Sequence, residues 1–208
     1  KMTTAEIPRI GIMGGTFDPI HYGHLVAAEE AREAFQLDKV VFVPAGIPPH
    51  KQGRQVTPAR HRYLMTLLAI MGNPGFDISR VDLDRGRVTY TVDTLQDLKG
   101  LMPDAKLYFI TGADAILEIL SWKAPQQVLS LAEFIAVTRP GYGLDKLADA
   151  LGALYDTSKD RIHILETPPV GVSSTDLRRR LENGRSVRYF IPQAVMVYIN
   201  KEGLYVGG

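Results

Sequence analysis

The chain has 208 residues, 45% of them hydrophobic, and a formal net charge of +1. This composition is ordinary for a globular protein with a buried core, and it excludes disordered and fibrous proteins. A near-neutral charge gives no general electrostatic basis for binding nucleic acid. Because the sequence contains no cysteine, disulfides, thiolate metal sites and a cysteine nucleophile are all excluded.

The sequence also lacks the features of a membrane protein. Apolar runs such as residues 40–43 and 64–71 fall well short of the roughly 20 residues that a membrane helix needs. The first residues contain no apolar signal-peptide core, so we expect a cytoplasmic protein with neither a membrane nor a nucleic-acid partner. Lys1 precedes the first methionine and is set aside as a remnant of expression. We expect residues 2–208 to form a single domain, and a homo-oligomer remains open.

Short apolar runs alternate with amphipathic stretches along the chain. The runs that we expect to be buried strands are residues 10–13, 40–43, 76–81, 107–110, 134–137 and 162–165. Most of the stretches between them are long enough to be crossover helices. This alternation predicts an α/β fold with a doubly wound parallel sheet covered by helices on both faces. A helical C-terminal part, at about residues 171–205, follows the core at residues 10–165.

Residues 57–71 carry the clearest helix signals. Thr57 offers a capping hydroxyl and Pro58 suits the first helical position. An apolar stripe at helical spacing follows, made of Leu64, Leu67, Leu68 and Met71. Before this helix, the Pro- and Gly-rich residues 44–55 predict a loop long enough to suggest a function.

The first polar cluster is GGTFDPIHYGH at residues 14–24, where a strand leads into a helix. Its glycines would let a phosphate approach the backbone near the helix N-terminus. His21 and His24 would share one face of the first turn and point at one oxyanion. The spacing alone also allows a zinc site or two structural histidines. A dehydrogenase fingerprint is excluded, because the second strand ends without the acidic residue that it requires. Asp18 is followed by proline, and this pair is more typical of a turn than of a metal ligand.

The second polar cluster is GVSSTDLR at residues 171–178. The simplest interpretation of its hydroxyls is that they cap the N-terminus of a helix. Arg178 lies one turn further on, where a guanidinium could bind the same anion as the helix N-terminus. In a doubly wound sheet such clusters gather beyond the carboxyl ends of the strands, where ligands bind.

Together the two clusters carry a family resemblance. The form G-x-F-D-P-x-H-x-G-H, paired with S-S-T-x-L-R, resembles the nucleotidyltransferase superfamily with a Rossmann-like fold. The segments PPHK, YTVDT, TGAD and SW, which begin at residues 48, 90, 111 and 121, are similar to those of bacterial nicotinate mononucleotide adenylyltransferases. The resemblance covers about residues 10–205, which is nearly the whole chain.

This resemblance implies an enzyme of NAD biosynthesis. Its substrates would be ATP and nicotinate mononucleotide, and its products nicotinate adenine dinucleotide and pyrophosphate. The nucleotide phosphate would attack the α-phosphorus of ATP directly, so catalysis would rest on positioning and charge stabilisation. A Mg²⁺ ion would be expected as cofactor, held mainly by ATP phosphates and water.

The resemblance also implies roles for individual residues. Catalysis is assigned to His21, His24 and Arg178. ATP binding is assigned to Gly14, Gly15, Thr16, Phe17, Gly112, Asp114, Ser173, Ser174 and Thr175. Binding of nicotinate mononucleotide is assigned to Lys51, Thr91, Trp122 and Arg139. Asp114 would accept hydrogen bonds from the ATP ribose, although it could also cap a helix beginning near Ala115. Trp122 would stack on the pyridine ring, and Lys51 would anchor the phosphate.

Two other functions stay open at this point. One is a related nucleotidyltransferase that acts on nicotinamide mononucleotide or phosphopantetheine, or that uses CTP. The other is a nucleotide-binding regulator that has a pocket but no turnover. The pair of histidines and Arg178 disfavour the regulator, because binding alone does not require contacts to a transition state.

Overall fold

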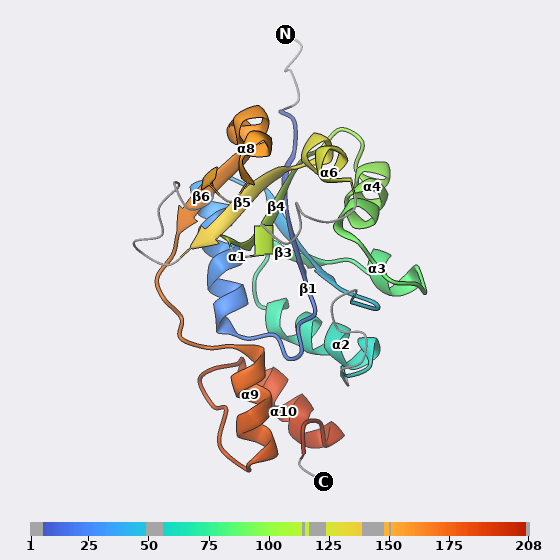
Figure 1. The fold of residues 1–208 in the computed structure, drawn as a ribbon. Coiled ribbons are helices and arrows are strands. Elements are labelled where there is room, and N and C mark those ends of the chain that lie inside the picture. The colour runs from blue at the N-terminus through green and yellow to red at the C-terminus, as the bar shows by residue number, and fades with distance from the viewer. Residues whose placement is uncertain are drawn as a thin grey trace.

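Six parallel strands form one sheet in the computed structural model, which describes residues 6–48, 56–113, 115–116, 124–138, 148–149 and 151–206. The strands are β1 (Arg9–Gly15), β2 (Lys39–Pro44), β3 (Phe76–Ile78), β4 (Lys106–Gly112), β5 (Glu133–Thr138) and β6 (Ile162–Glu166). Their order is β3-β2-β1-β4-β5-β6, so the direction of winding reverses between β1 and β4. The predicted doubly wound, Rossmann-like sheet is confirmed (Figure 1).

Helices cover both faces of this sheet. They are α1 (Tyr22–Ala34), α2 (Ala59–Ile70), α3 (Val81–Asp84), α4 (Thr91–Leu101), α6 (Pro125–Leu131), α8 (Ala153–Ser158), α9 (Ser174–Glu182) and α10 (Gln193–Glu202), with a 3-10 turn at Lys159–Arg161. Alternate residues of β4 show why two layers form. Leu107 and Phe109 pack with α4 and α6, whereas Tyr108 and Ile110 pack with α1 and α2.

The strand expected at residues 76–81 is shorter than predicted. β3 ends at Ile78, and Val81 begins the short helix α3. The Ser79 hydroxyl accepts a hydrogen bond from the Val81 N–H at 3.4 Å, which favours a helical turn. Asp82 of α3 is buried and bonded to Thr94 of α4 at 2.8 Å. The apolar residues of this segment predicted a strand, but contacts of Asp82, which directly follows it, hold Val81 in a helix.

The helix expected at residues 57–71 forms, but with different ends and a different buried face. α2 begins at Ala59, and Pro58 occupies the N-cap position in place of Thr57. The expected stripe is partly on the surface, since Leu64, Leu67 and Met71 are exposed. The buried side chains are His61, Arg62, Met65, Thr66 and Ile70. Polar residues therefore occupy much of the inner face of this helix.

The C-terminal helices α9 and α10 lie beyond the carboxyl end of β1, at the bottom of Figure 1. Leu177 of α9 and Val195 and Ile199 of α10 are buried in the same apolar cluster as β1 and β2. α10 ends at Gly203, whose φ of +61° is the left-handed conformation that glycine tolerates. This packing brings the end of the chain next to the loop that follows β1. No helix in the described residues is long and apolar enough to cross a membrane.

Candidate functional site

The loop after β1 has a backbone that depends on small residues and a buried ring. Phe17 is 2% exposed, and its φ of +50° is uncommon for a residue with a side chain. Its ring meets the His24 ring edge-on, with centroids 5.1 Å apart. A Cβ on Gly15 would come within 2.8 Å of the Phe17 ring, so only glycine fits there. The sequence thus folds the predicted phosphate-binding loop tightly around Phe17.

The two histidines lie at the start of α1, although not as predicted. His21 is the N-cap residue, one position before the helix, and His24 is in the first turn. Their rings stack with centroids 3.8 Å apart and planes 24° from parallel. The backbone N–H of His21 donates to Nδ1 of His24 at 3.2 Å. The N-cap position lets both imidazoles lie side by side at the helix N-terminus.

Burial keeps this pair neutral. It lowers the pKa of His21 to about 4. The pKa of His24 is lowered well below 6.5, first by burial and then by the proximity of His21. Because Nδ1 of His24 accepts a hydrogen bond, the proton of the neutral ring is on Nε2. Nδ1 of His21 is buried and has no hydrogen-bond partner in the described part of the chain. The site therefore offers neutral imidazole donors at neutral pH.

The second polar cluster packs directly against the first. Arg178 donates to the carbonyl oxygen of Asp18 at 2.7 Å, and the Ser174 hydroxyl donates to that of Pro19 at 2.9 Å. The Ser173 hydroxyl caps α9 by accepting from the Asp176 N–H at 3.1 Å, which is the plain role expected of it. The start of α9 and the start of α1 therefore form one unit from segments about 155 residues apart.

Asp18 has a structural place in this unit. It is 3% exposed and precedes Pro19 in the predicted turn. Its carboxylate accepts from the Tyr205 hydroxyl at 2.6 Å and from the Thr57 N–H at 3.3 Å. Both carboxylate oxygens are thus engaged by protein donors. Among the described residues, no three histidine, aspartate or glutamate side chains are close enough to hold a metal ion.

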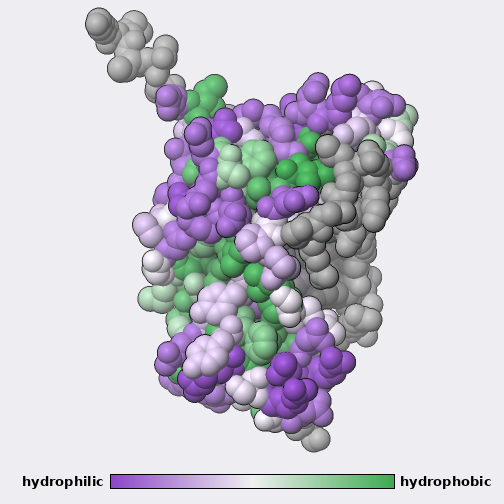
Figure 2. Space-filling view, turned by 90° about the vertical axis from the view of Figure 1, so that its left-hand side faces the viewer, coloured by the Kyte–Doolittle hydropathy of each residue, from purple (hydrophilic) through white to green (hydrophobic). Residues whose placement is uncertain are grey.

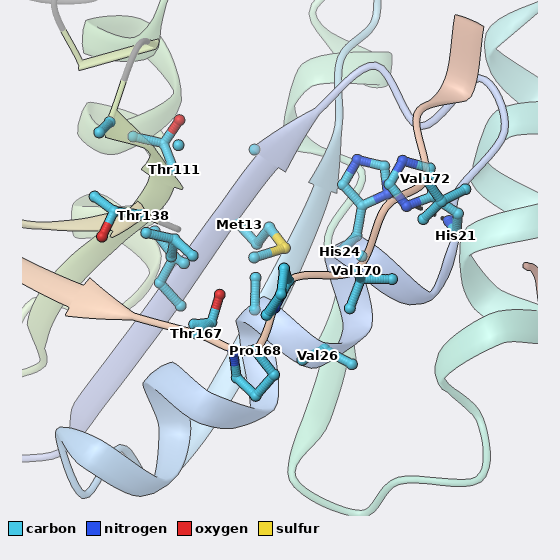
Figure 3. A pocket seen from close by; sticks show the side chains of 18 residues that line it. Met13, His21, His24, Val26, Thr111, Thr138, Thr167, Pro168, Val170 and Val172 are labelled. Carbon is cyan, nitrogen blue, oxygen red and sulfur yellow. Dashed lines mark hydrogen bonds between the residues drawn. The ribbon is translucent and has the colours of Figure 1, made fainter. Parts of the chain in front are cut away.

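A cavity of about 660 Å³ opens at the carboxyl ends of β1, β4 and β5 (Figure 3). Its walls include four of the predicted site residues, Gly14, His21, His24 and Gly112. The histidines lie at one end, and Thr111 and Thr138 lie at the other. The cavity occupies the point where the sheet reverses its winding, which is the usual ligand position in this architecture.

Several predicted residues do not line this cavity. They are Gly15, Thr16, Phe17, Thr91, Ser173, Ser174, Thr175 and Arg178. All but Thr91 belong to the two clusters that meet beside His21. Lys51, Asp114, Trp122 and Arg139 lie outside the described residues, as does most of the loop at residues 44–55.

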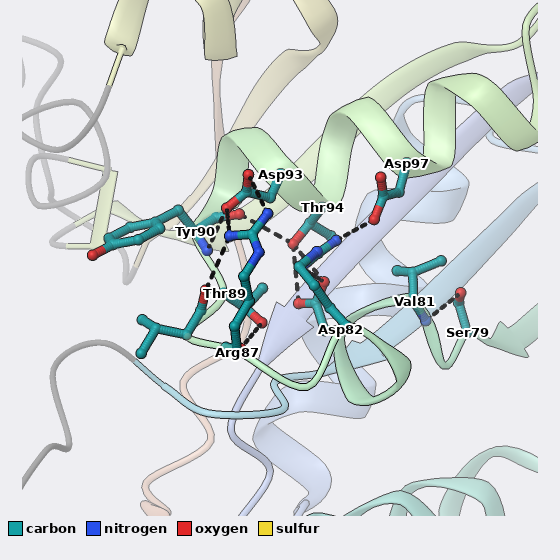
Figure 4. A network of polar contacts seen from close by, with 11 residues as sticks. Ser79, Val81, Asp82, Arg87, Thr89, Tyr90, Asp93, Thr94 and Asp97 are labelled. Atoms are coloured by element: carbon teal, nitrogen blue, oxygen red, sulfur yellow. Dashed lines mark hydrogen bonds and ion pairs between the residues drawn. The ribbon is translucent and has the colours of Figure 1, made fainter.

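Thr91 is held at the first position of α4 by a polar network (Figure 4). The backbone N–H of Tyr90 donates to the Asp93 carboxylate at 3.4 Å, which closes the start of the helix. One turn on, the Thr94 hydroxyl donates to the buried Asp82 at 2.8 Å. This network ties α4 to α3, on the face of the sheet opposite to α1.

Sequence reasoning missed three threonines in the cavity wall. Thr111 lies near the end of β4, Thr138 ends β5 and Thr167 directly follows β6. Thr138 is 6% exposed, and its hydroxyl has no hydrogen-bond partner among the residues that the structure describes. The sequence does place a threonine at or next to the end of each of three strands. This pattern predicts a shared site only when the strands are known to be neighbours in the sheet.

The segment between β6 and α9 supplies an apolar wall. It contributes Pro168, Pro169, Val170 and Val172 to the cavity. Apolar residues gather across the middle of the face that lies on the left of Figure 1, with polar residues above and below them (Figure 2). The cavity thus combines an apolar wall with hydroxyl, imidazole and backbone donors, as small-molecule sites commonly do.

The doubly wound sheet, the cavity at its switch point and the helix start that carries two imidazoles define a nucleotide-binding α/β protein. A family model described as "Cytidylyltransferase-like" matches residues 12–180. A relative from Moorella thermoacetica, named "Probable nicotinate-nucleotide adenylyltransferase", is 52% identical over 95% of this chain and 91% of its own length. One of the same name from Mycolicibacterium vanbaalenii is 53% identical over 95% of this chain and 92% of its own length.

Solved structures agree in fold. The Plasmodium falciparum nicotinic acid mononucleotide adenylyltransferase complexed with NaAD has a TM-score of 0.76, with 22% identity over 95% of this chain and 97% of that one. The chain therefore belongs to the cytidylyltransferase-like family, and within it to the nicotinate-nucleotide adenylyltransferases.

Proposed function

We propose that this protein transfers the adenylyl group of ATP to nicotinate mononucleotide, with nicotinate adenine dinucleotide and pyrophosphate as products. One observation carries the proposal: Arg178 and Ser174 bind the backbone of the loop that leads to His21 and His24. Two motifs from distant parts of the chain thereby become one anion site beside a nucleotide-sized cavity. The names of the relatives support the choice of acceptor.

The reaction needs no covalent intermediate on the protein. A phosphate oxygen of nicotinate mononucleotide forms a bond to the α-phosphorus of ATP, and the bond from that phosphorus to the bridging oxygen of pyrophosphate breaks. Catalysis then comes from orientation and from stabilising the charge that develops on the phosphate oxygens.

His21 and His24 stabilise that charge. Each is a neutral imidazole at the N-terminus of α1, where the positive end of the helix dipole also lies. A bound triphosphate beside the rings favours their protonated forms, so a donor strengthens as negative charge accumulates. The backbone of Gly14, Gly15, Thr16 and Phe17 contributes the tight approach to the phosphates.

The start of α9 holds the departing pyrophosphate. Ser173, Ser174 and Thr175 provide N–H groups at the helix start, Thr175 also offers its hydroxyl, and Arg178 provides the cation. One arm of the Arg178 guanidinium is already bonded to the Asp18 carbonyl. This bond orients the remaining N–H groups, so the cation is fixed in place before the substrate arrives.

The other residues divide between the two nucleotides. Gly112, in the cavity wall, contacts ATP, and Asp114 accepts hydrogen bonds from the ATP ribose. Lys51 anchors the acceptor phosphate, Trp122 stacks on its ring, Thr91 bonds the ring carboxylate and Arg139 assists with charge.

A Mg²⁺ ion belongs to the substrate side of the site. Asp18 has its carboxylate bonded to protein donors, and the described residues contain no cluster of metal-ligating side chains. The ion would be held mainly by ATP oxygens and water, as Mg²⁺ commonly is at phosphate sites. When bound, it neutralises phosphate charge.

The test offers ATP and Mg²⁺ with one acceptor at a time: nicotinate mononucleotide, nicotinamide mononucleotide or phosphopantetheine. A parallel reaction replaces ATP with CTP. Pyrophosphate release and the adenylylated product are measured by an enzyme-coupled assay and by chromatography. We expect turnover to be fastest with ATP and nicotinate mononucleotide. Absence of turnover with that pair, in protein shown to be folded, rejects the proposal.

A further inference from the structure

Arg62 is a buried cation in the inner face of α2. Its side chain is 1% exposed, although arginine is almost never fully buried unless it is paired. Burial lowers the pKa of its guanidinium, and the negative charge of the nearby Asp18 opposes that shift. Arginine stays protonated at neutral pH, so the molecule keeps a full positive charge in its interior.

Three N–H groups of this guanidinium donate to three backbone carbonyls. Nη1 bonds the carbonyl of Thr16 at 2.8 Å, Nη2 that of Gly46 at 2.9 Å and Nε that of Thr57 at 2.8 Å. These carbonyls belong to the loop after β1, the loop after β2 and the segment that precedes α2. One side chain therefore joins three segments at the carboxyl edge of the sheet.

The bond to Thr16 controls the phosphate-binding loop. The Thr16 carbonyl and the Phe17 N–H belong to one planar peptide, so they point in opposite directions. Holding the carbonyl against Arg62 turns the Phe17 N–H away from it. Phe17 also keeps a left-handed backbone, which is strained and needs contacts to maintain it. Its ring in turn rests against His24.

The bond to Gly46 connects Arg62 to the segment that precedes α4. Ile47, the next residue, forms a parallel bridge with Val88, and its carbonyl accepts from the Thr89 N–H at 3.2 Å. Thr89 lies two residues before the start of α4. Gly46 packs so closely against α3 that only glycine fits, because a Cβ there would lie 2.3 Å from the Asp82 carbonyl oxygen. Arg62 thus links the phosphate-binding loop to the segment that leads into α4.

We propose that Arg62 is a positioning residue for adenylyl transfer, which holds the loop after β1 and the described start of the loop after β2, at Gly46, in one fixed arrangement around the substrates. The inference rests on the proposed function. Lysine cannot replace it, because a single ammonium cannot match the planar fork that spans three carbonyls. A displacement of about 1 Å in such a site can cost about a hundredfold in rate.

The experiment compares wild type with Arg62→Lys and Arg62→Gln, and with Arg9→Lys as the matched control. Arg9 also donates its guanidinium to a backbone carbonyl, that of Phe35 at 2.9 and 3.1 Å, but at the opposite edge of the sheet. Urea unfolding at the assay temperature first shows that each variant is folded under the assay conditions. We expect kcat to fall at least tenfold in both Arg62 variants, with less than a threefold change in KM for ATP, and to stay near wild type in Arg9→Lys.

A second readout does not depend on turnover. The imidazole NMR signal of His21 is titrated in each variant without substrate. Loosening of the loop admits water to the histidines, so the His21 pKa should rise from about 4 toward 6.5 in the Arg62 variants only. Folded Arg62 variants with wild-type kcat and an unchanged His21 titration overturn the inference. The two proposals can fail separately. If the wild type has no turnover but the His21 titration shifts in the Arg62 variants, the proposed function is rejected and the role of Arg62 in positioning the loop is kept.

Discussion

The imidazoles of His21 and His24 stack with their centroids 3.8 Å apart, and the backbone N–H of one donates to Nδ1 of the other. Two imidazolium cations at this distance would repel each other, so this arrangement favours the neutral form of the pair. The Phe17 ring packs beside the pair, with its plane nearly perpendicular to that of His24. The start of α1 thus carries two closely packed neutral imidazoles.

The first prediction concerns His24. Replacement by alanine should lower kcat by about a hundredfold or more, because it removes a donor that acts on charge in the transition state. The KM for ATP should change much less, since many other contacts bind the nucleotide in the ground state. Steady-state kinetics on His24→Ala provide the measurement. The control is His163→Ala, because His163 pairs with Glu133 at 2.7 Å, at the far edge of the sheet. Equal turnover in the two variants would make His24 structural.

The second prediction concerns acid stability. The folded protein holds His21 at a pKa of about 4, below the unfolded value of about 6.5, so the unfolded chain binds more protons between these values. The free energy of unfolding is then fully retained above pH 6.5 and falls as the pH drops toward 4. His21 alone accounts for a loss of about 2 kcal/mol between pH 7 and pH 5.

Urea unfolding at pH 7 and pH 5 measures this loss. His21→Asn keeps a polar side chain but removes the titrating group. The loss of unfolding free energy between pH 7 and pH 5 should therefore be smaller in this variant than in wild type, by about 2 kcal/mol. The same pH dependence in wild type and variant would mean that His21 is not buried in its neutral form.

The third prediction concerns Gly23, between the two histidines. A Cβ at this position would lie 2.9 Å from the His21 ring, so Gly23→Ala forces that ring to move. We expect a loss of kcat similar to that of a His21 variant, with the fold retained. Gly100→Ala is the control, since Gly100 lies in α4 with open space around it, and alanine there should stabilise by about 0.5 to 1 kcal/mol. Unchanged kinetics in Gly23→Ala would show that the ring position is not critical.

The fold was predictable because its signals are local. Each buried strand is an apolar run bounded by polar or turn residues, and the six runs appear as six parallel neighbours. Predictions failed where long-range contacts decide. The expected strand at residues 76–81 ends at Ile78, and Val81 instead begins α3, which the bond from Thr94 to Asp82 ties to α4. The exposed Leu64 and the buried Arg62 reverse the face that the apolar stripe of α2 indicated.

Site residues that belong to a sequence motif were predictable, whereas residues that only the folded geometry brings together were not. His21, His24 and Gly14 stand in one motif, and the structure brings them to one cavity. Thr138 and Thr167 are 29 positions apart in the sequence and become neighbours only through the order of β5 and β6. No local pattern marks them, since a threonine at a strand end is common.

The last prediction concerns Tyr205, near the end of the chain. Its hydroxyl donates to the buried Asp18 carboxylate at 2.6 Å, and burial raises its pKa further above 10, so it stays a donor at every pH in use. Tyr205→Phe leaves that carboxylate without one of its donors, which should lower the free energy of unfolding by about 1 to 3 kcal/mol. Urea unfolding at pH 7 measures the loss. Tyr189→Phe is the control, because Tyr189 is 85% exposed and its hydroxyl should contribute less than about 0.5 kcal/mol. Equal stabilities of the two variants would show that the C-terminal segment does not support the turn at Asp18, and that the loop before His21 is held by Arg178 and Thr57 instead.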